Sequence, residues 1–426
     1  MDIPAREELI RQVRALPSAA PLLAAVGQEP GVHLVGGAVR DLLLAGGERG
    51  KRPARAIPAV DLDLVAEGDA GALAARLGGP YVLHSRFGTA TVTLNGHSYD
   101  LATARRETYA EPGALPEVAP APLREDLLRR DFTVNAIAIT LGGPHAGALT
   151  AAPNALEDLA GARLRVLHDR SFIDDPTRLL RLARYASRLG FAPEPATLAL
   201  ARKAVDGGAL GTVSGSRIGS ELRLLAREDD PVAALAALGG LGIDHALHPR
   251  FGLRDAELAR RALALLPPDG RRDMLALALA ASGVPPAELT RLLDDLAFEA
   301  DMRDGVLAAA AGAEGTARAL AAATRPSEIA AAVGRAGAEL VAIAGALGAR
   351  RQAREWLERL RHVHLEIDGG DLIAAGIPEG PAVGRGLRAA LAAKLDGLVF
   401  GSESELAEAL RAARDGREGF DPGGVL

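Results

Sequence analysis

The sequence contains no cysteine, which excludes disulfide bonds, thiolate zinc sites and cysteine nucleophiles. It also lacks any run of about 18 consecutive apolar residues, so we expect no transmembrane span and, by default, a cytoplasmic protein. Aromatic residues make up only 3% of a chain that is 48% apolar. Because alanine and leucine are abundant instead, this composition favours a globular protein rich in helices.

Lysine is also scarce, occurring only at Lys51, Lys203 and Lys394. The net charge of −6 argues weakly against a nucleic-acid partner. Nearly all the positive charge is arginine, however, and it clusters at Arg105 and Arg106, at Arg129 and Arg130, and along residues 163–188. Arginine binds phosphate through paired hydrogen bonds. The clusters therefore favour a phosphate-bearing ligand.

Strand and helix signals divide the chain into a mixed α/β head and an all-helical remainder. The expected head elements are strands at 32–35, 60–64, 89–94 and 97–101 and helices at 38–44 and 70–77. The clearest is a hairpin around Asn95-Gly96, a dipeptide typical of two-residue turns. Residues 110–122 are rich in proline and are expected to be mobile, and after about residue 155 strand signals almost vanish.

The run Val60-Asp61-Leu62-Asp63-Leu64 is the most informative stretch of the head. On a strand, successive side chains point to opposite faces, so Asp61 and Asp63 share one face. Two carboxylates side by side require a counter-charge, which a divalent cation supplies. Asp100, on the second strand of the hairpin, is a candidate third carboxylate. This pattern predicts metal-dependent phosphoryl or nucleotidyl transfer.

Three further segments carry polar groups suited to a nucleotide. Gly36-Gly37 lies between a predicted strand and helix, where the backbone can approach phosphate, and Arg40 follows one turn later. The run 129–136 supplies two arginines, an acid and an amide, which suit a triphosphate and a ribose hydroxyl. From these segments we predict nucleotide-binding roles for Gly36, Gly37, Arg40, Arg129, Arg130, Asp131 and Asn135.

The run Asp174-Asp175-Pro176-Thr177-Arg178 begins a predicted helix and allows two roles for its acids. One Asp can cap the helix ahead of Pro176. Asp175 and Arg178 also lie three residues apart on one helix face, where they can read a nucleobase. A carboxylate accepts from the amino group of cytosine or adenine and a guanidinium donates to the ring nitrogen, whereas guanine and uracil present the reverse pattern. Arg181 and Arg184, on the same predicted helix, join the predicted nucleotide-binding set.

Taken in order, these motifs resemble the class II tRNA nucleotidyltransferases, which include the CCA-adding enzymes and their poly(A) polymerase relatives. The matching pieces are residues 34–41, the Asp61/Asp63 pair, and residues 129–136, 158–165 and 174–178. Arg217-Ile218 with Glu221-Leu222 adds a weaker match, from which Ser216 departs because the family often has Glu there.

The resemblance implies an α+β head with a polymerase-β-like nucleotidyltransferase sheet, followed by an all-α neck, body and tail. We place these parts at residues 1–150, 151–235, 236–325 and 326–426. It implies that Asp61 and Asp63 hold catalytic Mg²⁺, that CTP and ATP are the nucleotides, and that Asp175 and Arg178 act as a protein template for the base. The implied partner is tRNA, bound at its acceptor arm and 3′ end, with no membrane or protein partner.

The activity within the family stays open at this point. CCA addition, CC-addition, A-addition by one enzyme of a split CC/A pair, and poly(A) synthesis share these motifs. The segment 105–123 lies where the family has a flexible loop that CC-only enzymes shorten or lose, so its presence favours competence for adding A. Two further alternatives are not enzymes that extend RNA. One is a non-catalytic tRNA-binding protein, and the other is a nucleotidyltransferase that acts on a small molecule.

Overall fold

The computed structural model describes residues 4–46, 62–84 and 88–415. The predicted metal ligand Asp61 and most of the predicted loose tail at 415–426 lie outside these ranges. The described chain separates into two compact units, one comprising residues 1–230 and 237–247, the other residues 231–236 and 248–426. The four-part division into head, neck, body and tail stays a prediction.

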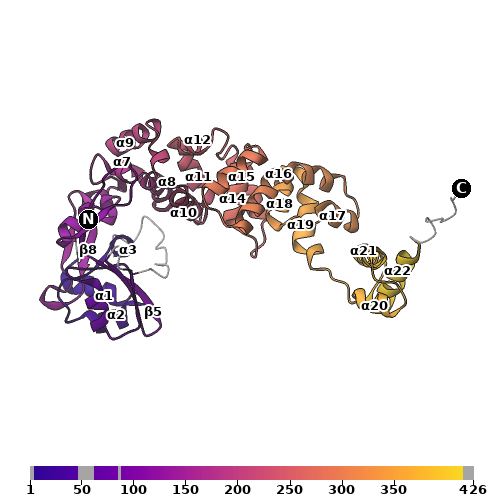
Figure 1. The fold of residues 1–426 in the computed structure, drawn as a ribbon, viewed down its shortest axis with the longest axis horizontal. Coiled ribbons are helices and arrows are strands. Elements are labelled where there is room, and N and C mark those ends of the chain that lie inside the picture. Colours follow the sequence, from indigo (N-terminus) through magenta and orange to yellow (C-terminus); the bar gives the residue numbers. More distant parts are fainter. Residues whose placement is uncertain (1–3, 47–61, 85–87, 416–426) are drawn as a thin grey trace. The chain divides into compact units, whose positions relative to one another are not determined.

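The head is built on a mixed sheet (Figure 1). Over the described residues this sheet has seven strands in the order β3-β4-β5-β2-β1-β8-β9. These strands are β1 Val32–Val35, β2 Leu64–Ala66, β3 Tyr81–His84, β4 Thr89–Leu94, β5 His97–Thr103, β8 Ile137–Thr140 and β9 Leu149–Ala151. The central strand β1 pairs antiparallel with both β2 and β8, whereas β2 pairs parallel with β5.

Apolar side chains fill both faces of the central strands, which explains why these segments contain little polar sequence. Every residue of β1, β2 and β8 is buried. Helices α3 (Gly37–Gly46) and α4 (Ala70–Arg76) pack against the sheet, and α1 (Arg6–Arg14) and α2 (Ala19–Val26) precede it. Burial of each large apolar side chain, such as Leu34, contributes about 2 kcal/mol.

Two local predictions for the head have different outcomes. The predicted hairpin is confirmed: β4 and β5 pair across Asn95-Gly96, both of which have positive φ. The strand predicted at 60–64 instead begins at Leu64 and runs to Ala66. Both faces of this strand are covered by other parts of the head. Its buried residues, Leu64 to Ala66, therefore follow the segment in which acidic and apolar residues alternate. Asp63 still pairs through its backbone, since its carbonyl accepts the Val35 N–H at 3.0 Å.

Part of the segment 110–122, which we expect to be mobile, forms a regular strand, and its mobility stays a prediction. Strands β6 (Arg105–Thr108) and β7 (Glu117–Pro120) pair antiparallel into a separate ribbon. The turn of this ribbon is fixed at Gly113, whose N–H donates to the Ile173 carbonyl at 3.2 Å. Ion pairs of Glu107 on β6 with Arg105 and Arg129 also order the ribbon, and the pair with the distant Arg129 leaves no local sequence signal.

Beyond the head the described elements are helical except for a two-residue strand pair, β10 (Arg163–Leu164) with β11 (Ala192–Pro193). The ribbon leads into α5 (Leu123–Leu128), and the helices that complete the first unit are α6 (Ala155–Ala160), α7 (Ser171–Asp174), α8 (Thr177–Leu189), α9 (Pro195–Asp206), α10 (Gly215–Ala226), and α12 (Ile243–Leu247). Helices α8 and α10 pack against each other. The α+β head with helices after it confirms the predicted fold class.

The second unit is all-helical over its described residues (Figure 1). It includes residues 231–236 of α11 (Pro231–Gly240). Its other helices are α13 (Ala256–Leu265), α14 (Arg272–Ala281), α15 (Pro286–Asp295), α16 (Ala300–Ala322), α17 (Pro326–Val333), α18 (Ala338–Ala344), α19 (Arg350–Glu358), α20 (Gly369–Ala374), α21 (Pro381–Leu395) and α22 (Gly401–Asp415). Within the described ranges no single helix could cross a membrane, although the bent pair 326–333 and 338–362 passes that test by length and composition.

Candidate active site

A glycine turn joins β1 to α3 and is flanked by two guanidinium groups. Gly36 has φ +74°, a conformation that favours glycine, and α3 begins at Gly37. A Cβ added at Gly36 would lie 3.3 Å from Arg130 Nη1, and one added at Gly37 would lie 3.4 Å from Arg40 Nη2. Free N–H groups at a helix start, together with two arginines, form a suitable place for phosphate.

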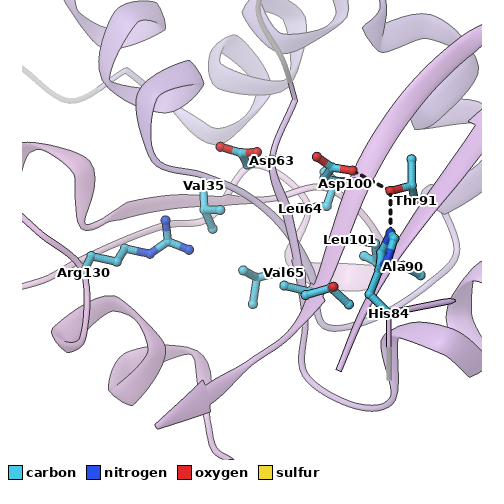
Figure 2. Close-up of a pocket in the computed structure, with 12 residues that line it drawn as sticks. Val35, Asp63, Leu64, Val65, His84, Ala90, Thr91, Asp100, Leu101 and Arg130 are labelled. Atoms are coloured by element: carbon cyan, nitrogen blue, oxygen red, sulfur yellow. Dashed lines mark hydrogen bonds between the residues drawn. The ribbon is translucent and has the colours of Figure 1, made fainter. Parts of the chain in front are cut away.

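Asp63 and Asp100 lie at the same end of the sheet. The parallel register pairs Leu64 with Leu101, so the two residues before this pair are adjacent and point to one face. Figure 2 shows both carboxylates on the same side of a cavity of about 360 Å³, with Arg130 across from them. Thr91 Oγ1 donates to Asp100 Oδ1 at 2.8 Å and fixes that carboxylate.

This pair of carboxylates has the chemistry that a hard divalent cation requires. Both groups line one cavity (Figure 2). Within the described ranges, no three His, Cys, Asp or Glu side chains are grouped closely enough to hold a metal, and the predicted ligand Asp61 lies outside those ranges. A Mg²⁺ site at Asp61 and Asp63 therefore stays a prediction with which the described residues are compatible.

A larger cavity of about 670 Å³ adjoins the first and shares Asp63 and Arg130 with it. Its walls come from the glycine turn, the ribbon, the segment after α5, and the helices α8 and α10. Most of the predicted nucleotide-binding residues line it, namely Gly36, Gly37, Arg129, Arg130, Asp131, Asn135, Asp175, Arg178 and Arg181. Among the described residues, Arg40 and Arg184 do not line it but lie behind its wall.

Asp131 is the buried centre of one wall. Its Oδ2 accepts from Arg181 Nη2 at 2.6 Å and its Oδ1 from Asn135 Nδ2 at 3.0 Å. Burial alone would raise the pKa of Asp131, but Arg181 and Asn135 hold this pKa well below its usual range. Arg40 Nη1 donates to Asn135 Oδ1 at 2.6 Å and extends the chain to the glycine turn. The network fixes the amide of Asn135 in the cavity wall.

The two predicted triphosphate arginines differ in how fully they are paired. Arg129 donates to Asp126 through Nε at 2.9 Å and to Glu107 through Nη1 at 2.9 Å. Arg130 donates from Nη2 to Asp126 at 3.0 Å, while its Nη1 points to the glycine turn. Arg130 is therefore the better placed of the two to contact phosphate, whereas Arg129 mainly orders the ribbon and α5.

Asp175 and Arg178 both line the cavity, but not on one helix face as predicted, because Asp175 has an extended backbone and precedes α8, whereas Arg178 lies in its first turn. Asp175 Oδ1 accepts from the Thr177 N–H at 3.1 Å, from Thr177 Oγ1 at 2.6 Å and from Arg217 Nη2 at 2.9 Å. Its Oδ2 lies 3.9 Å from Arg178 Nε. Arg178 is buried and donates from Nη1 to Ser171 Oγ and from Nη2 to the Arg129 carbonyl. One oxygen thus caps α8, and the other faces the arginine.

Arg181 and Arg184 pair with acidic residues of the neighbouring helix α10 and its end. Arg181 reaches Glu221 at 3.1 Å, and Arg184 lies 3.3 Å from Glu221 and 3.7 Å from Glu228. Asp131, Tyr185 and Glu221 raise the pKa of Arg181 against the lowering effect of its burial. These ion pairs hold α8 to α10, so both arginines have a structural role besides the predicted nucleotide-binding one.

The larger cavity is also lined by residues that the sequence predictions had not assigned to it, among them Glu107, Tyr109, Tyr185, Arg217 and Glu221. Burial raises the pKa of Tyr109, whose hydroxyl donates to Glu107. The spacing of Tyr185 after Arg178 and Arg181, at i+7 and i+4, could have indicated that it shares their helix face. The ribbon residues carry no comparable local signal.

Comparisons with known proteins agree with this geometry. Residues 32–165 match the family model of the poly A polymerase head domain. An A-adding tRNA nucleotidyltransferase of Halalkalibacterium halodurans is 43% identical over 223 residues, which cover 51% of this chain and 50% of that protein. A CC-adding tRNA nucleotidyltransferase of Deinococcus radiodurans is 42% identical over 221 residues, covering 51% and 55%. The chain thus spans about half the length of these curated relatives.

Solved structures match over nearly the whole chain. A CCA-adding enzyme in an apo form aligns with a TM-score of 0.78 and 28% identity, over 96% of this chain and 100% of that one. The Thermotoga maritima CCA-adding enzyme complexed with tRNA aligns with a TM-score of 0.74 and 26% identity, over 96% and 99%. The likeness extends through the helical second unit, beyond the segment matched by the head-domain model.

Proposed function

Because this chain is a relative of the tRNA nucleotidyltransferases, as its motifs predicted, we propose that it adds CMP and AMP to the 3′ end of tRNA. In this reaction the primer's 3′ hydroxyl loses its proton and its oxygen bonds to the α-phosphorus of CTP or ATP, while the bond to pyrophosphate breaks. The observation that carries the proposal is two cavities that share Asp63 and Arg130 and are lined by acidic groups, by the glycine turn with its arginine, and by Asp175 and Arg178.

Each wall of the joined cavities has a defined task in this proposal. Gly36, Gly37 and Arg130 hold the triphosphate, and the amide of Asn135 contacts the ribose. Asp61 and Asp63, with Asp100 nearby, would hold Mg²⁺, which supplies charge stabilisation at the reacting phosphate when bound. tRNA would contact the neck and the helical second unit through its acceptor arm.

The base-reading task falls to Asp175 and Arg178. Oδ1 of Asp175 is occupied by capping hydrogen bonds, which leaves Oδ2 to accept from the amino group of cytosine or adenine. Arg178 would donate to the ring nitrogen. The two roles predicted for this acid are thus compatible, because each uses a different oxygen of one carboxylate.

A-addition alone, in partnership with a CC-adding enzyme, is the second candidate. The A-adding relatives from Halalkalibacterium halodurans and Geobacter sulfurreducens are 43% and 40% identical to this chain, whereas a multifunctional CCA protein of Xanthomonas campestris is 35% identical. The ordered ribbon at 105–120 is consistent with either activity, since both require the addition of A.

The deciding experiment uses three tRNA transcripts. The first ends at the discriminator base, the second carries the first added C, and the third carries both added C residues. Each is incubated with CTP and ATP, singly and together, and the products are separated by length. CCA addition predicts that the first transcript gains three nucleotides and then stops. Extension of the CC-ending transcript alone indicates A-addition, and a long A-tract indicates poly(A) synthesis. No extension of any transcript would refute the proposed function.

A further inference from the structure

The ring of Tyr185 on α8 is surrounded by arginines from two parts of the first unit. The guanidinium carbon of Arg184 lies 5.1 Å from the ring centroid, that of Arg40 5.5 Å and that of Arg181 5.6 Å. Phe132 contacts the same ring edge-on, with centroids 5.9 Å apart. Tyr185 is 9% exposed, and the exposed part lines the larger cavity. One aromatic ring thus touches head and neck arginines together.

Three like charges around one ring require a compensating interaction. Carboxylates pair with each arginine: Asp41 with Arg40, Asp131 and Glu221 with Arg181, and Glu221 and Glu228 with Arg184. The negative face of an aromatic ring attracts guanidinium groups within about 6 Å, and more strongly where water is excluded. Since Arg40 lies on α3 of the head, the ring connects an arginine behind the glycine turn to the arginines of α8.

The position of these arginines relates the ring to phosphate. Arg40 Nη2 lies 3.4 Å from the Cβ position of Gly37, and Arg181 lines the cavity directly. We propose that Tyr185 is a positioning residue, which holds Arg181 in the cavity wall and Arg40 behind the glycine turn, so that the cavity is positively charged beside the polyphosphate of the incoming nucleotide. This inference rests on the proposed function, because it assigns a task within that nucleotide site.

The matching test varies the electrostatics of the ring while its shape is kept. Phenylalanine with an increasing number of ring fluorines is incorporated at position 185, and the Kd for inorganic tripolyphosphate is measured by calorimetry without divalent cations. We expect Tyr185→Phe to bind within about twofold of the wild type, and each added fluorine to weaken binding, reaching about tenfold for the fully fluorinated ring. The same series at Phe172, buried on α7, is the control and should leave the Kd unchanged.

Steady-state kinetics provide a second test. If Tyr185 only packed against its neighbours, its loss would not change KM for CTP and ATP while preserving the preference among nucleotides. Neither Asp175 nor Arg178 is among the arginine-ring contacts described for Tyr185. Tyr185→Leu should therefore raise KM for CTP and ATP by the same factor, about tenfold, and leave the preference for CTP over UTP unchanged. Thermal unfolding of each variant establishes that it is folded.

The outcomes separate this inference from the proposed function. A Kd that does not change across the fluorinated series overturns the positioning role of Tyr185, even if the protein adds nucleotides to tRNA. If the Kd for tripolyphosphate rises with each added fluorine but the protein extends no transcript, the role of the ring in polyphosphate binding is supported. Only the proposed transferase activity is then refuted. If Tyr185→Leu does not fold, the fluorinated series still decides, because those rings keep the shape of the native side chain.

Discussion

At the scale of single residues, the site depends on side chains with two tasks. The carboxylate of Asp175 caps α8 with one oxygen and presents the other to Arg178. Arg181 both pairs with Asp131 and lines the cavity. Removing such a side chain changes stability and chemistry together, so informative substitutions are those that remove one task and preserve the other.

Replacement of either predicted metal ligand should reduce catalysis without changing the stability of the fold. We expect Asp61→Ala and Asp63→Ala each to lower the rate of nucleotide addition at least about a hundredfold, because charge at the reacting phosphate is no longer stabilised. Asp63 is exposed, so its loss should leave thermal unfolding and tRNA binding unchanged. Asp206→Ala, at an exposed position of α9, is the control. Near-normal turnover of the Asp63 variant at saturating Mg²⁺ would exclude the metal role.

At the scale of elements, the ribbon β6–β7 is tied to the base-reading residues. Arg217 donates to the Gly113 carbonyl at 3.1 Å and to Asp175 at 2.9 Å. Tyr109 and Glu107 connect the ribbon to Arg129, whose carbonyl accepts from Arg178. A change in the ribbon can therefore reach both members of the base-reading pair.

Replacing residues 105–123 with a short Gly-Ser linker should spare CMP incorporation and impair AMP incorporation. The reason is that the segment lies where the family's loop supports the addition of A. The measurement is extension of transcripts that end before and after CC, with CTP or ATP. Unchanged AMP addition to the CC-ending transcript would count against this role of the ribbon.

A single substitution tests the ribbon contact more finely. Gly113 has φ +72°, and a Cβ there would lie 2.4 Å from the Thr212 carbonyl oxygen, so Gly113→Ala should displace the turn and slow AMP addition several-fold relative to CMP addition. Gly96 has φ +81° with nothing within 4 Å of its Cβ position, which makes Gly96→Ala the matched control for backbone strain alone. Equal effects of both substitutions on AMP addition would refute a specific role of the ribbon turn.

Elements with a strong local signal could be predicted, and those held by distant partners could not. Asn95-Gly96 specified the hairpin because few dipeptides adopt its positive φ values. Asp175 and Arg178 do line one cavity, but the helix face predicted for them is wrong for Asp175, whose extended backbone precedes α8. The ribbon was missed because its strands depend on Glu107 meeting Arg129, and on Arg217 meeting Gly113, which are 22 and 104 residues apart.

At the scale of the whole molecule, buried histidines make stability depend on pH. His33, on the central strand β1, is buried between Thr140 and Glu67. Burial lowers the pKa of His33 below 6.5 despite the opposing effect of Glu67, and burial likewise lowers that of His168. The unfolded state then binds more protons than the folded state at mildly acidic pH.

The contribution of the neutral histidines to the free energy of unfolding should therefore be complete above about pH 6.5 and should decrease as the pH falls toward about 5. His33→Gln, which keeps polar atoms near Thr140 but does not titrate, should reduce this slope. Denaturation of the wild type and the variant at a series of pH values provides the measurement. A slope of the same size in both proteins would show that His33 is not its source.

The most direct measurement is base selection by Asp175→Asn on a tRNA transcript, with CTP, ATP, UTP and GTP supplied separately. The amide oxygen can still cap α8, so thermal stability should stay within about 1 kcal/mol of the wild type. The amide nitrogen donates where the wild-type oxygen accepts, so the preference for CTP and ATP should fall by about 1–3 kcal/mol and UTP or GTP incorporation should rise. A stable variant that keeps the wild-type preference for CTP and ATP, with Arg178→Ala doing the same, would contradict base selection by this pair.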